Sequence, residues 1–278
     1  MSNLKNDLPS HSDASCLFEG MTSINAIIHA IESGTNDRQI LRIFFDRDKT
    51  TSKSRELAFL RKESEKLGFH IEFTNSTVID KITTGTTHGG IVAECTKRAY
   101  PVLDATFVRQ DGFYVFLDGI EDPYNFGYVL RSLYAAGVDG VVLSERNWMS
   151  AAGTVARASA GTSELLSVCI ADPASVPSVF RQCGYKILAA GIRNSVSLYD
   201  ADMHFPLLMI VGGEKRGINK TVSKYADKTV SIVYPRDTGI SLSASSAAAI
   251  IAYQVANRLD SPPRKPNYSN RGAGRRPR

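Results

Sequence analysis

Apolar residues recur along the first third of the chain at intervals that predict a small domain of helices and strands. Ile24, Ile27, Ile28 and Ile31 follow helical spacing, and Gly34 ends the pattern. Further elements are expected as strands over residues 39–45, 69–73 and 90–95, a helix over 55–67 and a loop rich in threonine and glycine over 83–90. The pattern therefore predicts an α/β/α domain over residues 17–95.

Beyond residue 111 the apolar runs become nearly continuous, which is typical of strands buried on both faces of a sheet. Strands are expected over residues 113–117, 140–143, 166–170, 186–190, 207–211 and 228–233. Helices are expected over residues 126–136, 151–160, 174–183, 219–225 and 242–258. This order predicts an α/β domain over residues 112–260, with a mainly parallel sheet covered by helices on both faces. Residues 96–111 contain Pro101, lack periodicity and are expected to form a linker.

The positive charge of the chain is concentrated at its C-terminal end. Residues 261–278 contain six arginines and lysines and no acidic residue, so the net charge of +5 leaves about −1 for residues 1–260. Such a segment buries too little apolar surface to fold, and we expect a disordered basic tail that either adds non-specific affinity for phosphate or is simply solvated. The polar residues 1–16 are likewise expected to be disordered.

Composition argues against a membrane protein and against a metal enzyme. No apolar run approaches the ~20 residues of a membrane-spanning helix, and the first fifteen residues lack the layout of a secretory signal. The four cysteines have no Cys-x-x-Cys spacing, and the five histidines have no His-x-x-x-His spacing. We therefore expect a cytoplasmic protein with reduced, mostly buried thiols and no bound metal.

The first of three candidate motifs joins the end of an apolar strand to a helix. Asp118 ends the strand, and Pro123 and Gly127 shape the turn. Asn125 lies at the expected helix N-terminus, where its side chain could cap free amide groups. Arg131 follows about 1.7 turns later. Asn125 is either a cap or a ligand-binding group, and Arg131 is either a solvated or a functional side chain. Their place near strand ends, where α/β proteins bind ligands, favours function.

The second motif is a glycine loop that follows the apolar run 207–211. Gly212 and Gly213 permit a positive φ or the close approach of a ligand to the backbone, and Glu214 could cap or neutralise a group at the strand end. The loop lacks the Gly-Lys-Ser/Thr of a phosphate-binding loop and the spacing of a dinucleotide fingerprint. This argues against ATP and NAD as ligands.

The third motif opens the last expected helix, after an irregular loop over residues 234–239. Serines at positions 241, 243, 245 and 246 precede three alanines that permit close backbone packing. The serines are either a helix cap or a wall of amide and hydroxyl groups that faces a ligand.

Taken in order, the three motifs resemble those of the SpoU (TrmH-type) RNA ribose 2′-O-methyltransferases of the SPOUT superfamily, over residues 113–258. The resemblance rests on Asn125-Phe126-Gly127 with Arg131, on Gly212-Gly213-Glu214-Lys215-Arg216-Gly217 and on Ser241-Leu242-Ser243-Ala244-Ser245. The leading domain resembles the substrate-binding domain of members that modify rRNA. Its His88-Gly89-Gly90-Ile91-Val92-Ala93 is similar to the His-Gln-Gly-Val end of that domain, with Gly89 in place of Gln.

The resemblance implies a SPOUT-type parallel sheet with a deep trefoil knot, a homodimer, and S-adenosyl-L-methionine (AdoMet) as the cofactor. It places Gly212, Val233 and Leu242 against the cofactor, largely through their backbone. The catalytic motif positions that it implies are Asn125, Arg131, Glu214, Ser241 and Ser243. The family usually has Asn where this chain has Ser243, which shortens a polar contact near the substrate.

The function implied is methylation of a ribose 2′-hydroxyl in RNA, and the leading domain favours 23S (large-subunit) rRNA over tRNA. Orientation of the reactants can supply ~7–11 kcal/mol of the barrier. Because an arginine with a pKa above ~12 is a poor base, we expect Arg131 to bind the adjacent phosphate and to stabilise a developing alkoxide. Three alternatives remain open: a knotted enzyme that methylates a base nitrogen, a non-catalytic RNA-binding paralogue, and an unrelated nucleotide-binding α/β enzyme.

Overall fold

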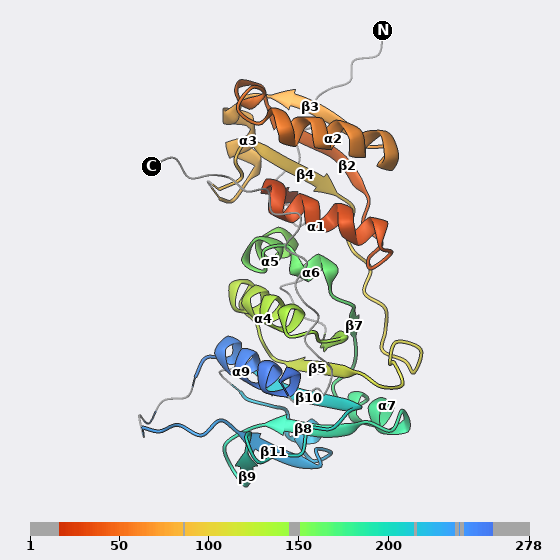
Figure 1. The fold of residues 1–278 in the computed structure, drawn as a ribbon, viewed down its shortest axis with the longest axis vertical. Helices are drawn as coiled ribbons and strands as arrows, with labels where there is room; N and C mark the ends of the chain where they lie inside the picture. The colour runs from red at the N-terminus through yellow and green to blue at the C-terminus, as the bar shows by residue number, and fades with distance from the viewer. Residues whose placement is uncertain are drawn as a thin grey trace.

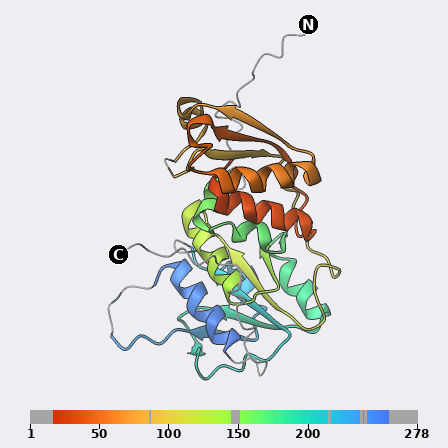
Figure 2. The same cartoon turned by 45° about the horizontal axis from the view of Figure 1, so that its top comes forward.

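Two sheets, each with helices on both faces, lie end to end along the molecule (Figure 1 and Figure 2). The computed structural model describes residues 17–85, 87–144, 151–213, 216–236, 239 and 242–257. The predicted α/β fold class is confirmed, with a mixed sheet in the first domain and a parallel sheet in the second. The knot stays a prediction, and the two expected disordered ends lie outside the described residues. Within the described part, no helix is long and apolar enough to span a bilayer.

The first domain is a four-stranded sheet in the order β1-β4-β2-β3. β4 runs antiparallel to β1 and β2, whereas β2 and β3 are parallel. Apolar residues of α1 and α2 share a core with one face of this sheet, and Ile79 and Ile82 of α3 pack on the other face. The elements are β1 (Leu17–Glu19), α1 (Gly20–Glu32), β2 (Ile40–Asp46), α2 (Ser54–Leu67), β3 (His70–Thr74), α3 (Ser76–Ile82) and β4 (Ile91–Cys95). A short 3-10 turn, η2 (Arg47–Lys49), follows β2.

The second domain is a seven-stranded sheet in the order β7-β6-β5-β10-β8-β11-β9, with every ladder parallel. Its strands are β5 (Phe113–Asp118), β6 (Gly140–Leu143), β7 (Val168–Ile170), β8 (Lys186–Ala190), β9 (Ser195–Ser197), β10 (Leu207–Gly212) and β11 (Lys228–Ser231). Its helices are α4 (Pro123–Ala135), α5 (Ala152–Ala158), α6 (Thr162–Leu165), α7 (Val176–Gln182), α8 (Lys220–Ser223) and α9 (Ala244–Ala256).

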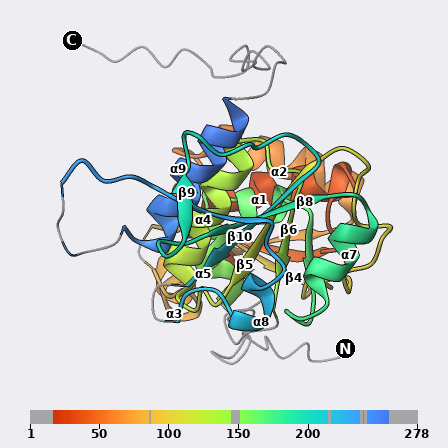
Figure 3. The ribbon, with the colours of Figure 1, turned by 90° about the horizontal axis from the view of Figure 1, so that it is seen from below.

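Alternate residues of the central strand β5 face two separate cores. Phe113, Val115 and Leu117 pack against α4, α5 and α9, whereas Tyr114 and Phe116 pack against α7 and α8. Figure 3 shows α4 and α9 on one side of the sheet and α7 on the other. Because side chains of a strand alternate between its faces, a continuous apolar run such as β5 requires helices on both sides.

The segment expected as a linker, residues 96–111, adds to the edge of the second sheet. Val102 forms a parallel bridge with Ile170, the amide of Leu103 donates to Ile170 O (2.8 Å), and the amide of Ile170 donates to Pro101 O (2.9 Å). Leu103 is buried in the core on the α7 face. The backbone pairing therefore fixes the segment to β7, although its side chains show no strand pattern.

Three helical layers, made by α1, by α5 with α6, and by α4, connect the two sheets (Figure 1). Two glycines allow these layers to approach closely. A Cβ on Gly127 of α4 would lie 2.6 Å from Ala158 Cβ and 2.9 Å from Val155 O, both on α5. A Cβ on Gly161 would lie 2.5 Å from Ala26 Cβ on α1. Ala156 of α5 is fully buried in the core of the first domain. The helices of the second domain thus complete the core of the first.

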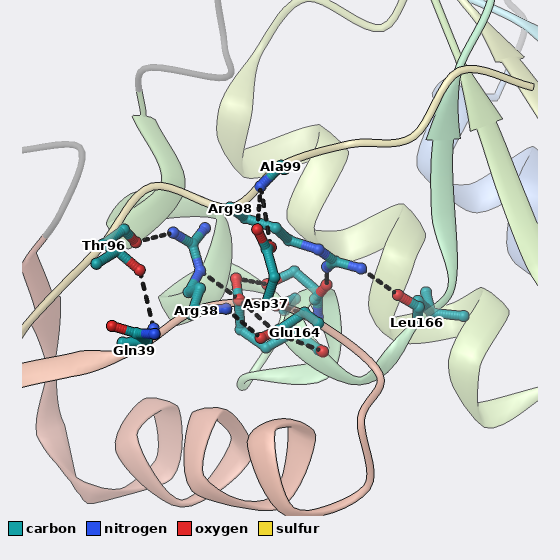
Figure 4. Close-up of polar contacts among 11 residues, drawn as sticks. Asp37, Arg38, Gln39, Thr96, Arg98, Ala99, Glu164 and Leu166 are labelled. Atoms are coloured by element: carbon teal, nitrogen blue, oxygen red, sulfur yellow. Dashed lines mark hydrogen bonds and ion pairs between the residues drawn. The ribbon is translucent and has the colours of Figure 1, made fainter. Parts of the chain in front are cut away.

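A buried polar cluster also joins the domains (Figure 4). Arg38 Nε donates to Glu164 Oε2 at 2.7 Å, and both side chains are almost fully buried. Arg98 donates to the carbonyls of Ser163 and Leu166, at 2.9 Å each. Burial alone would lower the pKa of Arg38, but the neighbouring Glu164 carboxylate outweighs it and raises that pKa, so the guanidinium stays charged. Removing one partner of such a pair typically costs about 3–5 kcal/mol.

We predict that Gly127→Ala destabilises the protein by about 1–2 kcal/mol, because the overpacking cost against α5 exceeds the helix-propensity gain of about 1 kcal/mol. Chemical denaturation measures the free energy of unfolding. Ser132→Ala, on the same helix but partly exposed, serves as the control and should be neutral or mildly stabilising. A Gly127→Ala protein as stable as wild type would show that α4 does not require this close approach.

Candidate functional site

The site lies where the winding of the second sheet reverses, between β5 and β10. The chain proceeds from β5 to β6 and β7 on one side, whereas β10 and β8 lie on the other. Ligands of open α/β sheets bind at such a switch point, beyond the carboxyl ends of the strands. Gly212, the last residue of β10, is the register partner of Asp118, the last residue of β5. The first and second motifs therefore meet at this edge.

Backbone contact between the two strand ends explains the glycines of the second motif. The amide of Gly213 donates to Asp118 O (2.8 Å), and a Cβ on Gly213 would lie 2.1 Å from Gly119 O. A Cβ on Gly212 would lie 2.4 Å from the carbonyl carbon of Gly217 and from the amide nitrogen of Ile218. Because the obstructing atoms are backbone, no side-chain rotation could relieve either contact.

The buried carboxylate of Asp118 ties the glycine loop to the end of β5. Its Oδ2 accepts from the amide of Asn219 at 2.7 Å, and the amide of Gly217 closes the loop by donating to Gly213 O at 2.9 Å. Asn219 in turn caps α8 by accepting from the amide of Thr221. Asp118 thus has a structural role, since it holds the glycine loop against the end of β5.

Asp122, rather than Asn125, caps α4, which corrects the expected start of this helix. The helix begins at Pro123, and Asp122 Oδ1 accepts from the amide of Asn125 at 2.8 Å. Aspartate at the N-cap followed by proline at the first helical position is a favoured helix start. The side chain of Asn125 is therefore not required as a cap, and it lines a cavity.

This first cavity, of about 210 Å³, opens between the first turn of α4 and the glycine loop. It carries groups of both signs, since Glu121, Asp122 and Arg216 all line it. Its lining residues are Asp118, Gly119, Ile120, Glu121, Asp122, Asn125, Arg216, Gly217, Asn219 and Ala244. A cavity with an arginine, an amide side chain and carboxylates suits a polar, hydrogen-bonding ligand.

A second cavity, of about 230 Å³, lies against the carboxyl ends of β8, β10 and β11 and the start of α9. Its walls are largely glycine backbone and apolar side chains, among them Gly191, Ile192, Gly212, Tyr234 and Leu242. The amide of Leu242 donates to Tyr234 Oη at 3.2 Å, which links two of the lining residues. Such a lining suits a flat, partly apolar ligand held by backbone groups.

The two cavities are neighbours, because Gly217 and Ala244 line both of them. A ligand in one would therefore lie beside a ligand in the other. This arrangement suits a transfer between two bound molecules.

The structure brings together some of the residues expected from the sequence. Gly212 and Leu242 line the second cavity, and Asn125 lines the first. Val233 lines neither; it is half-exposed between Ile232 and Tyr234, which do line the second cavity. Glu214 and Ser241 lie outside the described residues.

Two other expected residues have different positions. Arg131 is exposed on α4 and lines neither cavity. Ser243 is the N-cap of α9: its Oγ accepts from the amide of Ser246 at 3.2 Å and lies 2.9 Å from Ser245 Oγ. The catalytic roles of both residues stay predictions.

Sequence reasoning did not single out Asp118, Asp122 or Arg216 as site residues. Position was the available signal, because Asp118 ends a strand, Asp122 precedes a proline and Arg216 lies within the glycine loop. No group of three His, Cys, Asp or Glu side chains that could hold a metal ion occurs within the described part of the chain.

Comparison with known families matches both domains. Residues 112–253, just over half of the chain, match the SpoU rRNA Methylase family, and residues 24–101 match the RNA 2′-O ribose methyltransferase substrate binding domain. The chain therefore belongs to the SpoU family of RNA 2′-O-ribose methyltransferases.

Individual relatives agree with this assignment. YacO of Bacillus subtilis, named for the TrmH family of tRNA/rRNA methyltransferases, is 26% identical over 237 residues, 83% of this chain and 92% of its own. The 23S rRNA (guanosine-2′-O-)-methyltransferase RlmB of Shewanella oneidensis is 28% identical over 202 residues, 70% of this chain and 81% of its own.

Solved structures share the fold. The AdoMet-bound rRNA methyltransferase of Sinorhizobium meliloti superimposes with a TM-score of 0.74 at 19% identity, covering 94% of this chain and 98% of its own. The SpoU methyltransferase AviRb of Streptomyces viridochromogenes, in complex with AdoMet, has a TM-score of 0.69 at 20% identity, covering 87% and 89%.

We predict that Gly213→Ala destabilises the protein by about 3 kcal/mol, since its Cβ would separate the ends of β5 and β10. Denaturant unfolding provides the measurement. The matched control is Gly191→Ala at the same edge of the sheet, where the Cβ would meet the rotatable methyl of Thr229 instead of backbone. Equal effects of the two substitutions would contradict the proposed backbone contact.

Proposed function

We propose that this chain transfers a methyl group from AdoMet to a ribose 2′-hydroxyl of RNA, with large-subunit rRNA as the substrate. The observation that carries the proposal is the pair of adjoining cavities at the β5–β10 switch point. The apolar, backbone-rich second cavity suits the cofactor, and the polar first cavity suits a ribose and its phosphate. AdoMet bound there would supply an electrophilic methyl group.

The chain's own residues then hold the substrate. Arg216, at the first cavity, can bind an RNA phosphate through charge-assisted hydrogen bonds. Asn125 can donate to or accept from a ribose hydroxyl. Gly212 and Leu242 line the second cavity, and a cofactor bound there would be held mainly by backbone groups. Transfer requires the hydroxyl oxygen in line with the methyl carbon, and holding both reactants in adjoining cavities provides that orientation.

The substrate class has support from the leading domain and from one relative. Residues 24–101 match an RNA substrate binding domain, and the Shewanella oneidensis relative is named for 23S rRNA. A tRNA substrate is the second candidate, because the name of the Bacillus subtilis relative includes both RNAs.

The exposed surface of α4 and α9 supports a homodimer. Tyr124, Tyr128, Arg131 and Ala135 form one exposed stripe at helical spacing on α4. Ile250 and Tyr253 are exposed on α9, which packs beside α4. Aromatic residues are enriched at protein interfaces. A second copy bound to this α4–α9 face would cover Arg131 and place it next to groups of the partner subunit. Arg131 could then act at the partner's site, although it does not line a cavity of its own chain.

We expect the purified chain to bind AdoMet in calorimetry and to transfer its methyl group to rRNA from a strain that lacks this gene, more than to tRNA. Nucleoside analysis of the product should show a 2′-O-methylated ribose. Arg131→Ala should lower the transfer rate by about 10²–10³-fold, by loss of charge stabilisation at the reacting oxygen, and should leave AdoMet affinity nearly unchanged.

Arg181→Ala, which removes an exposed ion pair with Asp227, is the control and should retain full activity. A methylated base would favour the base-nitrogen enzyme, and absence of AdoMet binding would favour the non-catalytic paralogue. Near wild-type transfer by Arg131→Ala would remove this arginine from the mechanism.

We also expect a dimer in sedimentation equilibrium at micromolar concentration and a shift toward monomer in Tyr128→Glu, because a buried carboxylate without a partner opposes association. The control is Tyr199→Glu, which adds the same charge at another exposed tyrosine outside this face. A monomeric wild-type protein would refute the dimer.

A further inference from the structure

The substrate-binding domain contacts the second domain through two separate ion pairs, one from each of the segments that flank α1. The Arg38–Glu164 cluster follows the C-terminal end of this helix, and Glu19 precedes its N-terminal end. The 13-residue helix α1 separates the two contacts along the chain. With one contact alone the domain could pivot about it, whereas two contacts fix its rotation.

Glu19 and Arg157 form the contact at the N-terminal end. Arg157 Nη1 donates to Glu19 Oε2 at 2.8 Å, and the carboxylate is 8% exposed. The other oxygen, Oε1, accepts from the amides of Thr84 and Gly85 at 3.0 and 3.2 Å. A Cβ on Gly85 would lie 1.9 Å from Arg157 Nη1, so the loop passes directly over the guanidinium. The ion pair therefore holds a loop of the substrate-binding domain, not only its first strand.

Side-chain contacts of His88 hold the other end of this loop, at residues 88–90. The ring of His88 is buried; its Nδ1 lies 3.0 Å from the amide of Gly90, and its Nε2 lies 3.0 Å from Asp80 Oδ1. Gly20 packs beside this loop, since its Cβ would lie 3.7 Å from Thr87 O. A loop anchored in this way moves with its domain.

Arg157 also touches the first motif. Its Nη2 donates to Tyr124 Oη at 3.3 Å. Tyr124 lies in the first turn of α4, next to Asn125 and two residues after Asp122, both of which line the first cavity. One guanidinium thus lies against the loop at Gly85 and donates to Tyr124 in the first turn of α4.

We infer that Arg157 is a positioning residue: with Glu19 it sets the orientation of the substrate-binding domain, and of RNA held by that domain, relative to the first cavity. This inference rests on the proposed function. Without Arg157 the Arg38–Glu164 cluster would still hold the domains together, but the end of α1 near the cavity would be free to swing. RNA would then bind as before and reach the methyl-transfer geometry less often.

The test compares Arg157→Ala, Arg157→Lys and the control Arg181→Ala, using the whole chain. For Arg157→Ala we expect kcat for rRNA methylation to fall roughly tenfold or more, with KM for rRNA and the affinity for AdoMet each within about twofold of wild type. Arg157→Lys keeps the charge, and we expect it to recover part of the rate. A rise in KM at unchanged kcat would instead identify Arg157 as an RNA contact, and loss of AdoMet binding would identify it as a structural residue; either result overturns the inference.

Amide hydrogen exchange gives a second readout that needs no activity. In Arg157→Ala, exchange at Thr84 and Gly85 should quicken about tenfold or more, while the amides of Ser163 and Glu164, at the other end of α1, keep wild-type protection. Unchanged exchange at Thr84 and Gly85 would overturn the inference. If the wild-type chain methylates neither rRNA nor tRNA, the proposed function fails, and the exchange pattern still decides whether Arg157 orients the domain.

Discussion

The site depends on one close backbone contact, between the ends of β5 and β10. Gly213 lies against Gly119 with no room for a Cβ between them, and the buried carboxylate of Asp118 holds the loop that follows. This contact brings the first turn of α4 and the glycine loop to one cavity. Ala244, at the start of α9, lines both this cavity and its neighbour. Without it, three motifs distant in the sequence would not form one site.

A second constraint acts on the placement of the substrate. Small residues allow α4, α5 with α6, and α1 to stack closely between the two sheets. Hydrophobic contact in such a stack is non-directional and would tolerate sliding or rotation. The ion pairs Arg38–Glu164 and Arg157–Glu19 are directional, and they lie at opposite ends of α1. Packing thus brings the domains together, and the polar contacts select one orientation.

Periodicity predicted most long elements, because a strand buried on both faces and an amphipathic helix each have a distinct pattern. It missed β1, β9, α6 and the 3-10 turn η2, which have three or four residues each, and also the seven-residue helix α3. Segments this short form strands or turns only through pairing with distant partners, such as β4 for β1. The helix α4 begins three residues before its expected start at residue 126, because Asp122 provides the cap for which Asn125 was one candidate. The Asp122-Pro123 pair is a local signal of a helix start, and the apolar periodicity does not include it.

The sequence alone determined the two α/β domains, the three motifs and their family, since these follow from local spacing and residue type. Tertiary structure decided which motif residues share a cavity. It placed Gly212, Leu242 and Asn125 at the cavities, Arg131 on an exposed helical face, and Arg216 at the same cavity as Asp122. It also decided the carboxylate partners of Arg38 and Arg157, Glu164 and Glu19, which are more than 100 residues away along the chain. Such pairings depend on how the helices stack in space, and no local pattern in the sequence encodes them.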